Sequence, residues 1–216
     1  MTRGRAPSTS VSGLSERSLP ARAFALAGRL SRVGVWVGGV LTLASALLIS
    51  YDVIVRRLFS VTIGGSDELS GYAFAISTTW ALAYTALERA NVRVDVVYQH
   101  LPVRVGAVLD WLALVAIGVF AVYLTYHAQG VAAQSWQQGS AANTPLGTPL
   151  WIPQMLWVAG LAWFSLVLAL MLVRASVAMA TGDLETLRAV CGVRSAQEEA
   201  EEEAEAGVRL VKGESA

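Results

Sequence analysis

Charged side chains are absent from three long stretches of this 216-residue chain. No Asp, Glu, Lys or Arg occurs in Val33 to Tyr51, in Leu69 to Leu87, or in the 63 residues from Trp111 to Val173. A helix needs about 20 apolar residues to cross the hydrocarbon core of a bilayer, so each of the first two stretches is long enough to span it once. The absences therefore exclude an ordinary soluble domain and indicate a membrane protein.

The longest uncharged stretch is too long for one membrane span. Its middle, residues 127–149, is rich in Gln, Ser, Asn, Gly and Pro, which favour a loop over lipid-exposed helix. The sequence thus predicts an all-α integral membrane protein with four transmembrane helices, at about residues 33–55, 69–87, 104–126 and 150–173.

Cysteine and histidine are scarce, which limits cofactor chemistry. The lone Cys191 excludes an internal disulfide, and it could join a thiolate metal site only with another chain. His100 and His127 bracket the third predicted helix and would lie ~40 Å apart, too far to share one haem iron. We expect no cofactor, metal or nucleic acid; a haem would require ligands from a partner, as in a membrane anchor of a redox enzyme.

Catalytic and transport motifs are also missing. The sequence contains no GxSxG, HExxH, phosphate-binding glycine loop or CxxC, and no predicted span carries an ionisable residue near its centre. A self-sufficient coupled transporter needs such a group, although a small homo-oligomeric transporter stays open as an alternative. The pattern predicts a non-catalytic subunit and not an enzyme.

The placement of charge predicts the topology. Residues 1–32 hold six Arg and one Glu, and we interpret them as a retained basic tail, because the following apolar stretch is too long for a cleaved signal. Residues 33–175 form the predicted membrane domain, and 176–216 a second tail that is acidic near 198–205. The positive-inside rule places both termini in the cytoplasm.

Two arginines lie on the side of the predicted membrane that is poor in positive charge. Arg56 follows Asp52 by four residues, which favours an ion pair on one helical face, and Arg57 is adjacent. Asp67 and Glu68 begin the second helix, where its dipole favours carboxylates. These five residues predict either a latch that fixes the first helical hairpin or a docking site for another subunit.

Small residues recur every fourth position in the second helix, at Gly71, Ala75, Thr79 and Ala83, with a weaker version at Gly34 and Gly38 in the first. Such stripes let helices approach closely in lipid, within the chain or between subunits.

Asp110, two turns into the third helix, needs a partner from another helix or chain unless its side chain reaches the inner interface, which we expect. Six tryptophans fall mostly near predicted interfaces and are interpreted as membrane anchors: Trp36, Trp80, Trp111, Trp136, Trp151 and Trp157.

Three segments occur in an order that resembles a known family. They are Asp52 to Phe59 followed by Asp67-Glu68-Leu69, the connection Glu88 to Asp95 with Leu101-Pro102, and Thr144 to Pro153. Together they resemble the DctQ-like small membrane subunit of tripartite ATP-independent periplasmic (TRAP) transporters, over roughly residues 33–175. The family often has His where Asn91 stands, and this chain doubles the arginine at 56 and 57.

The resemblance implies a three-part transporter in the bacterial inner membrane. A periplasmic solute-binding protein delivers an organic anion, and a large membrane subunit imports it with sodium ions. The small subunit packs against the stationary part of the large one. The candidate residues for structural or subunit contacts are Asp52, Arg56, Arg57, Asp67, Glu68, Gly71, Ala75 and Asp110.

Overall fold

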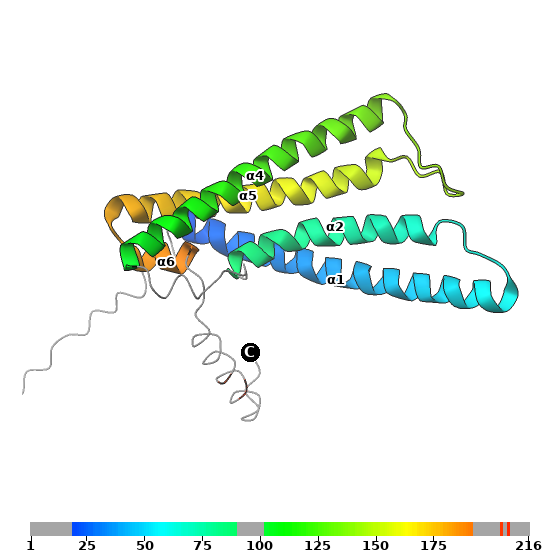
Figure 1. Ribbon diagram of the computed structural model, residues 1–216, viewed down its shortest axis with the longest axis horizontal. Coiled ribbons are helices and arrows are strands. Elements are labelled where there is room, and N and C mark those ends of the chain that lie inside the picture. Colours follow the sequence, from blue (N-terminus) through cyan, green and yellow to red (C-terminus); the bar gives the residue numbers. More distant parts are fainter. Residues whose placement is uncertain (1–18, 90–101, 192–203, 205–206, 208–216) are drawn as a thin grey trace, which may run out of the picture.

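The described part of the chain consists of long helices joined by short loops (Figure 1). The computed structural model describes residues 19–89, 102–191, 204 and 207. Its helices are α1 (Leu19–Phe59), α2 (Ser66–Leu87), α4 (Val103–Gln137), α5 (Trp151–Thr181) and α6 (Leu184–Cys191). The all-helical prediction is confirmed for these residues, which contain no strand beyond one isolated bridge between Ala141 and Pro149.

Three of the described helices are long and apolar enough to cross a membrane. They comprise Arg22–Phe59, Arg104–Gln137 and Trp151–Thr181. Helix α2 has the length but not the hydropathy, because hydroxyl-bearing residues interrupt its apolar side chains. Three of the four predicted spans are therefore supported as apolar helices.

The helices extend beyond the predicted spans. Helix α1 begins at Leu19 within the basic segment, α4 continues to Gln137, and α5 continues to Thr181. Charged and polar residues bound the part of a helix that lipid can cover, but they do not end the helix itself, since Arg and Gln are good helix formers. The acidic residues near 198–205 and the segment around Asn91 lie outside the described residues, apart from residue 204.

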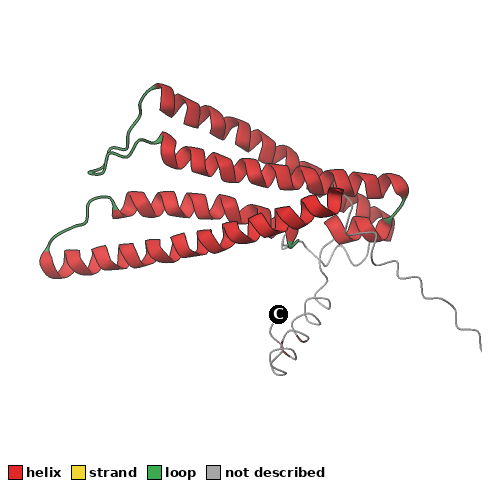
Figure 2. Ribbon diagram, turned by 180° about the vertical axis from the view of Figure 1, so that it is seen from behind, coloured by secondary structure: helices red, strands yellow, loops and turns green. Residues whose placement is uncertain are grey.

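The four long helices pack as a row and not as a closed bundle. Helix α1 packs on α2, α2 on α5 and α5 on α4, and the α1–α2 and α4–α5 hairpins diverge toward their connecting loops (Figures 1 and 2). At the opposite end, α6 packs against α4 and α5. We call the two ends of the molecule the loop end and the α6 end.

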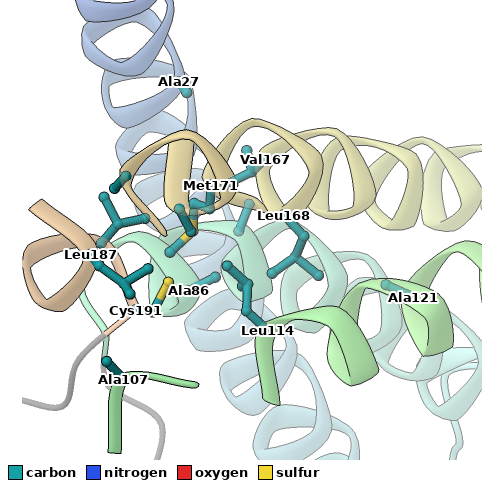
Figure 3. Packing of buried hydrophobic residues seen from close by; sticks show 14 residues of the cluster. Ala27, Ala86, Ala107, Leu114, Ala121, Val167, Leu168, Met171, Leu187 and Cys191 are labelled. Atoms are coloured by element: carbon teal, nitrogen blue, oxygen red, sulfur yellow. The ribbon is translucent and has the colours of Figure 1, made fainter. Parts of the chain in front are cut away.

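The buried apolar cluster lies toward the α6 end, where the helices converge (Figure 3). It combines small residues such as Ala83 and Ala175 with Val167, Met171 and Leu187. Small side chains let the helix backbones approach, so packing replaces the hydrophobic driving force that lipid does not supply.

Glycines mark the closest helix contacts. A Cβ on Gly38 would lie 3.2 Å from Ser77 Cα, and one on Gly34 would lie 3.4 Å from the Trp80 carbonyl oxygen, so the predicted glycine face of α1 packs on α2. A Cβ on Gly160 of α5 would lie 2.6 Å from Thr79 Oγ1. These glycines permit the α1–α2 and α2–α5 contacts.

Tryptophan side chains link the helices by hydrogen bonds. Trp80 Nε1 donates to the Leu156 carbonyl (3.1 Å), Trp111 Nε1 to Ser176 Oγ (3.0 Å), and Trp163 Nε1 to Ser31 Oγ (3.1 Å). Trp80 and Trp111 thus do more than the predicted anchoring at interfaces, and Trp163 was not singled out in the sequence. Such bonds tie α2, α4 and α1 to α5.

Helix α6 begins with a side-chain cap. Asp183 accepts hydrogen bonds from Thr186 N (2.9 Å) and Thr186 Oγ1 (2.6 Å), and these bonds hold the pKa of Asp183 below its ordinary value. The cap satisfies a backbone N–H that the helix leaves without a partner. It also holds α6 where Leu187 and Cys191 are buried.

We expect Asp183→Ala to loosen α6 from the α6 end. Because an N-cap is worth about a fivefold change in a local equilibrium, maleimide should label Cys191, the chain's one cysteine, about fivefold faster in this variant. Asp183→Asn, which preserves capping, and Glu185→Ala should label at the wild-type rate. Equal labelling of all four proteins would show that the cap does not hold α6.

Candidate subunit-contact site

The predicted charged cluster lies at the loop end, where α1 turns into α2. The turn comprises residues 60–65, and Gly65 adopts φ 97° directly before α2 begins. A left-handed conformation at this position favours glycine. The turn thus places the end of α1 beside the first turn of α2.

Asp52, near the end of α1, is a buried residue that binds this turn. It is 4% exposed, and its Oδ1 accepts hydrogen bonds from Ile63 N (2.6 Å) and Thr62 Oγ1 (3.3 Å). Its Oδ2 lies 3.6 Å from Arg56 NH2, the predicted i, i+4 pair. A carboxylate that binds the backbone of the turn fixes the hairpin more firmly than an exposed ion pair would.

Arg57 and Asp67 lie apart from this network. Both are exposed, and neither forms an ion pair with a described residue. The structure therefore brings Asp52 and Arg56 together but assembles no five-residue ionic cluster in the part of the chain that it describes.

Glu68 points to the other hairpin. Its carboxylate accepts hydrogen bonds from Tyr72 OH (2.9 Å) and from Thr144 Oγ1, in the loop between α4 and α5. The Thr144 bond, with others from Thr148 and Tyr72, lowers the pKa of Glu68 from its ordinary value of 4.5 despite partial desolvation. A carboxylate with these donors remains ionised at neutral pH.

Apolar contacts accompany this polar bridge. A Cβ on Gly64 would lie 2.9 Å from Pro145 Cβ, and one on Gly65 would overlap the Leu146 side chain. We call this junction, formed by Gly64, Gly65, Glu68 and residues 144–148, the loop clasp. It joins the two hairpins at the end where their helices diverge.

The loop that carries Thr144 is itself ordered by backbone hydrogen bonds. Ala142 N donates to the Thr148 carbonyl (2.9 Å), and Leu150 N donates to the Ser140 carbonyl (3.0 Å). Gly147 turns the chain at φ 58°. The sequence indicated a loop and a resemblance at Thr144 to Pro153, but no spacing rule joined that loop to Glu68.

The remaining predicted contact residues lie elsewhere. Gly71 is exposed with open space where a Cβ would be, and Ala75 is partly buried, so the stripe packs more closely at Thr79 and Ala83. Asp110 is 5% exposed and interacts with other residues.

The chain is similar to a known protein family over more than half of its length. Residues 45–178 match the family described as tripartite ATP-independent periplasmic transporters, DctQ component. The chain belongs to this family. No curated protein and no solved structure shows significant similarity to the chain. The DctQ match confirms the resemblance and identifies the chain as the small permease subunit of a TRAP transporter, and the redox-anchor and autonomous-transporter alternatives gain no support.

The DctQ match includes the whole loop clasp, the last part of α1, all of α2 and α4, and α5 as far as residue 178. It begins within α1, after the basic residues at that helix's start, and it ends before α6. The described residues contain no group of three or more His, Cys, Asp or Glu able to hold a metal ion. The matched residues therefore contain the loop clasp but no metal site in the part of the chain that the structure describes.

Through Glu68, the loop clasp makes the stability of the folded protein depend on pH. Because the folded protein lowers the pKa of Glu68, its stabilising contribution is present above pH 4.5 and is lost as pH falls through the lower folded pKa. We expect Glu68→Gln to lower the unfolding temperature at pH 7.5, with the difference from wild type shrinking below pH 4.5. Thermal unfolding of both proteins at pH 7.5 and at a pH below 4.5 measures this difference.

Thr144→Val provides the matched control for that experiment, because it removes the hydroxyl that donates to Glu68 and leaves the Glu68 carboxylate in place. Combined with Glu68→Gln it should add little to the loss at pH 7.5, since both changes break one interaction. A pH-independent difference between wild type and Glu68→Gln would refute the role of the ionised carboxylate.

Proposed function

We propose that this DctQ subunit crosses the bacterial inner membrane four times and scaffolds the large subunit of its transporter. In this proposal residues 33–175 form the membrane domain, and the tails 1–32 and 176–216 lie in the cytoplasm. The large subunit imports an organic anion that a periplasmic solute-binding protein delivers. The main support for this function is the DctQ match over two helical hairpins. Their uncharged stretches contain no group that could couple transport to an ion.

Helix α2 fits the fourth span. Its 22 residues reach ~33 Å, enough for the hydrocarbon core. Its hydroxyls donate back to carbonyls one turn earlier, as Ser70 does to Ser66 and Ser77 to Ala73. Because these bonds satisfy the hydroxyls within the helix, α2 can cross lipid despite its lower hydropathy.

The charge distribution supports the orientation. The loop between α4 and α5 carries no Lys or Arg, and the turn before α2 contributes only Arg56 and Arg57 at the end of α1. Arg56 is paired with Asp52, which offsets its charge. The loop end then faces the periplasm and the α6 end the cytoplasm.

In this proposal the large subunit binds to the exposed apolar surface of the row of four long helices. Helices α1 and α4 expose large apolar side chains, including Leu43, Leu47, Phe120 and Tyr123. The loop clasp fixes the angle between the two hairpins, and thereby the shape of that surface. The subunit then needs no catalytic residue of its own.

Assembly of the complex tests this function. Glu68→Ala and Arg56→Ala should lower recovery of the small and large subunits as a complex more than they change the affinity for the transported anion. Glu185→Ala, an exposed acid at the α6 end, is the matched control. Normal assembly with altered anion affinity would contradict a scaffold role.

A further inference from the structure

Three arginines form an exposed band on the first turns of α1. Arg22, Arg29 and Arg32 are all exposed, and their spacings of seven and three place them on one side of the helix. None forms an ion pair with a described residue. We call them the arginine band, and the DctQ match does not include them because it begins at residue 45.

Apolar side chains occupy the same side of the helix. Leu26 is 61% exposed and Val33 is 59% exposed, and Leu30 lies between them, also exposed. A segment placed fully in water would expose these leucines at a cost. The alternation of arginine and leucine fits a boundary between polar and apolar surroundings.

The length of α1 places the arginine band at such a boundary. The helix has 41 residues and reaches ~62 Å, about twice the thickness of the hydrocarbon core. The uncharged stretch Val33 to Tyr51 covers the core, so Arg29 and Arg32, within about 6 Å of that stretch along the helix, lie at the level of the lipid head groups. Trp36, 73% exposed, lies one turn inside, where aromatic side chains favour the interface.

A fourth cation lies at this end of the molecule. The Arg174 guanidinium of α5 stacks over the Phe24 ring, 5.0 Å from its centroid. The carboxylate of Asp183, at the same end, accepts hydrogen bonds from Thr186. The α6 end therefore presents positive charge beside an apolar helix face.

We propose that the arginine band binds the head group of an anionic phospholipid, with the acyl chains of that lipid against the exposed side chains of Val33, Val37 and Val40. Guanidinium groups bind phosphate oxygens in a bidentate manner, and anionic lipids attract cationic residues beside a membrane segment. A free phosphate would use the arginines but not the apolar side chains that follow them. The inference does not depend on how the subunit contacts the rest of its transporter.

Fluorescence quenching in nanodiscs tests the proposal. The full chain is reconstituted in phosphatidylcholine with a small fraction of lipid whose acyl chains carry bromine, either phosphatidylglycerol or phosphatidylcholine. Subtracting the spectrum of Trp36→Phe isolates the emission of Trp36. We expect brominated phosphatidylglycerol to quench Trp36 more strongly, with its local enrichment reduced about fivefold for each arginine removed.

Variants assign the effect to the arginine band. Arg29→Gln/Arg32→Gln should lose the preference for phosphatidylglycerol, Arg29→Lys/Arg32→Lys should retain most of it, and Arg57→Gln at the loop end should leave it unchanged. Equal quenching of wild-type Trp36 by the two lipids would overturn the proposal without any variant. Retention of the preference in the glutamine variant would overturn it as well.

Discussion

Gly160→Val should separate α2 from α5 and destabilise the fold by about 1–3 kcal/mol, the usual cost of overpacking. A Cβ at this position would lie 2.6 Å from Thr79 Oγ1, 2.9 Å from Trp80 Cδ1 and 3.0 Å from Thr79 Cβ. The added side chain cannot turn away from all three atoms, because Gly160 is buried in the contact. Moving α5 outward would also stretch the hydrogen bond from Trp80 to Leu156.

Thermal unfolding in detergent or nanodiscs measures the effect of this substitution. Gly130→Val is the matched control, since Gly130 is an exposed glycine of α4 with open space where a Cβ would be. It carries the same change in side chain and the same helical setting. An equal loss of stability in both variants would show that α2 and α5 do not require the close approach.

Gly65→Val should open the loop clasp. The residue adopts φ 97°, a conformation that costs a side-chain-bearing residue about 1–2 kcal/mol, and its Cβ would overlap the Leu146 side chain. Both effects act on the turn that places Glu68 beside Thr144. We expect faster amide exchange at Ala142 and Leu150, whose backbone bonds hold the α4–α5 loop.

A double variant separates the two effects at Gly65. Leu146→Ala removes the overlapping side chain but leaves the backbone strain, so Gly65→Val/Leu146→Ala should recover only part of the lost stability. Leu146→Ala alone should cost little, because Leu146 is 47% exposed. Full recovery in the double variant would mean that the backbone conformation of Gly65 contributes nothing.

The sequence was sufficient to predict the helices because lipid imposes a strong constraint. Uncharged stretches indicated α1, α4 and α5, and the polar residues 127–149 indicated a break between the last two, although α4 continues to Gln137 before the chain leaves the helix. The helix ends were less predictable. Arg22, Arg29 and Arg32 lie outside the uncharged stretch, but α1 continues through them to Leu19.

The contacts between distant segments could be predicted only in part. The i, i+4 spacing of Asp52 and Arg56 indicated their pair. Glu68 and Thr144 lie 76 residues apart, and their contact depends on how the two hairpins pack, which no local spacing encodes. Likewise, nothing near Trp163 in the sequence indicates that its indole donates to Ser31.

The proteins that bind the tagged chain in its native membranes show whether it is the small subunit of a larger transporter. After solubilisation in mild detergent, mass spectrometry identifies every protein that stays bound. We expect a large multi-spanning membrane subunit, present in the wild-type sample and reduced in Glu68→Ala. Recovery of the chain alone, or with a haem-containing redox partner, would contradict its role as the small permease subunit of a TRAP transporter.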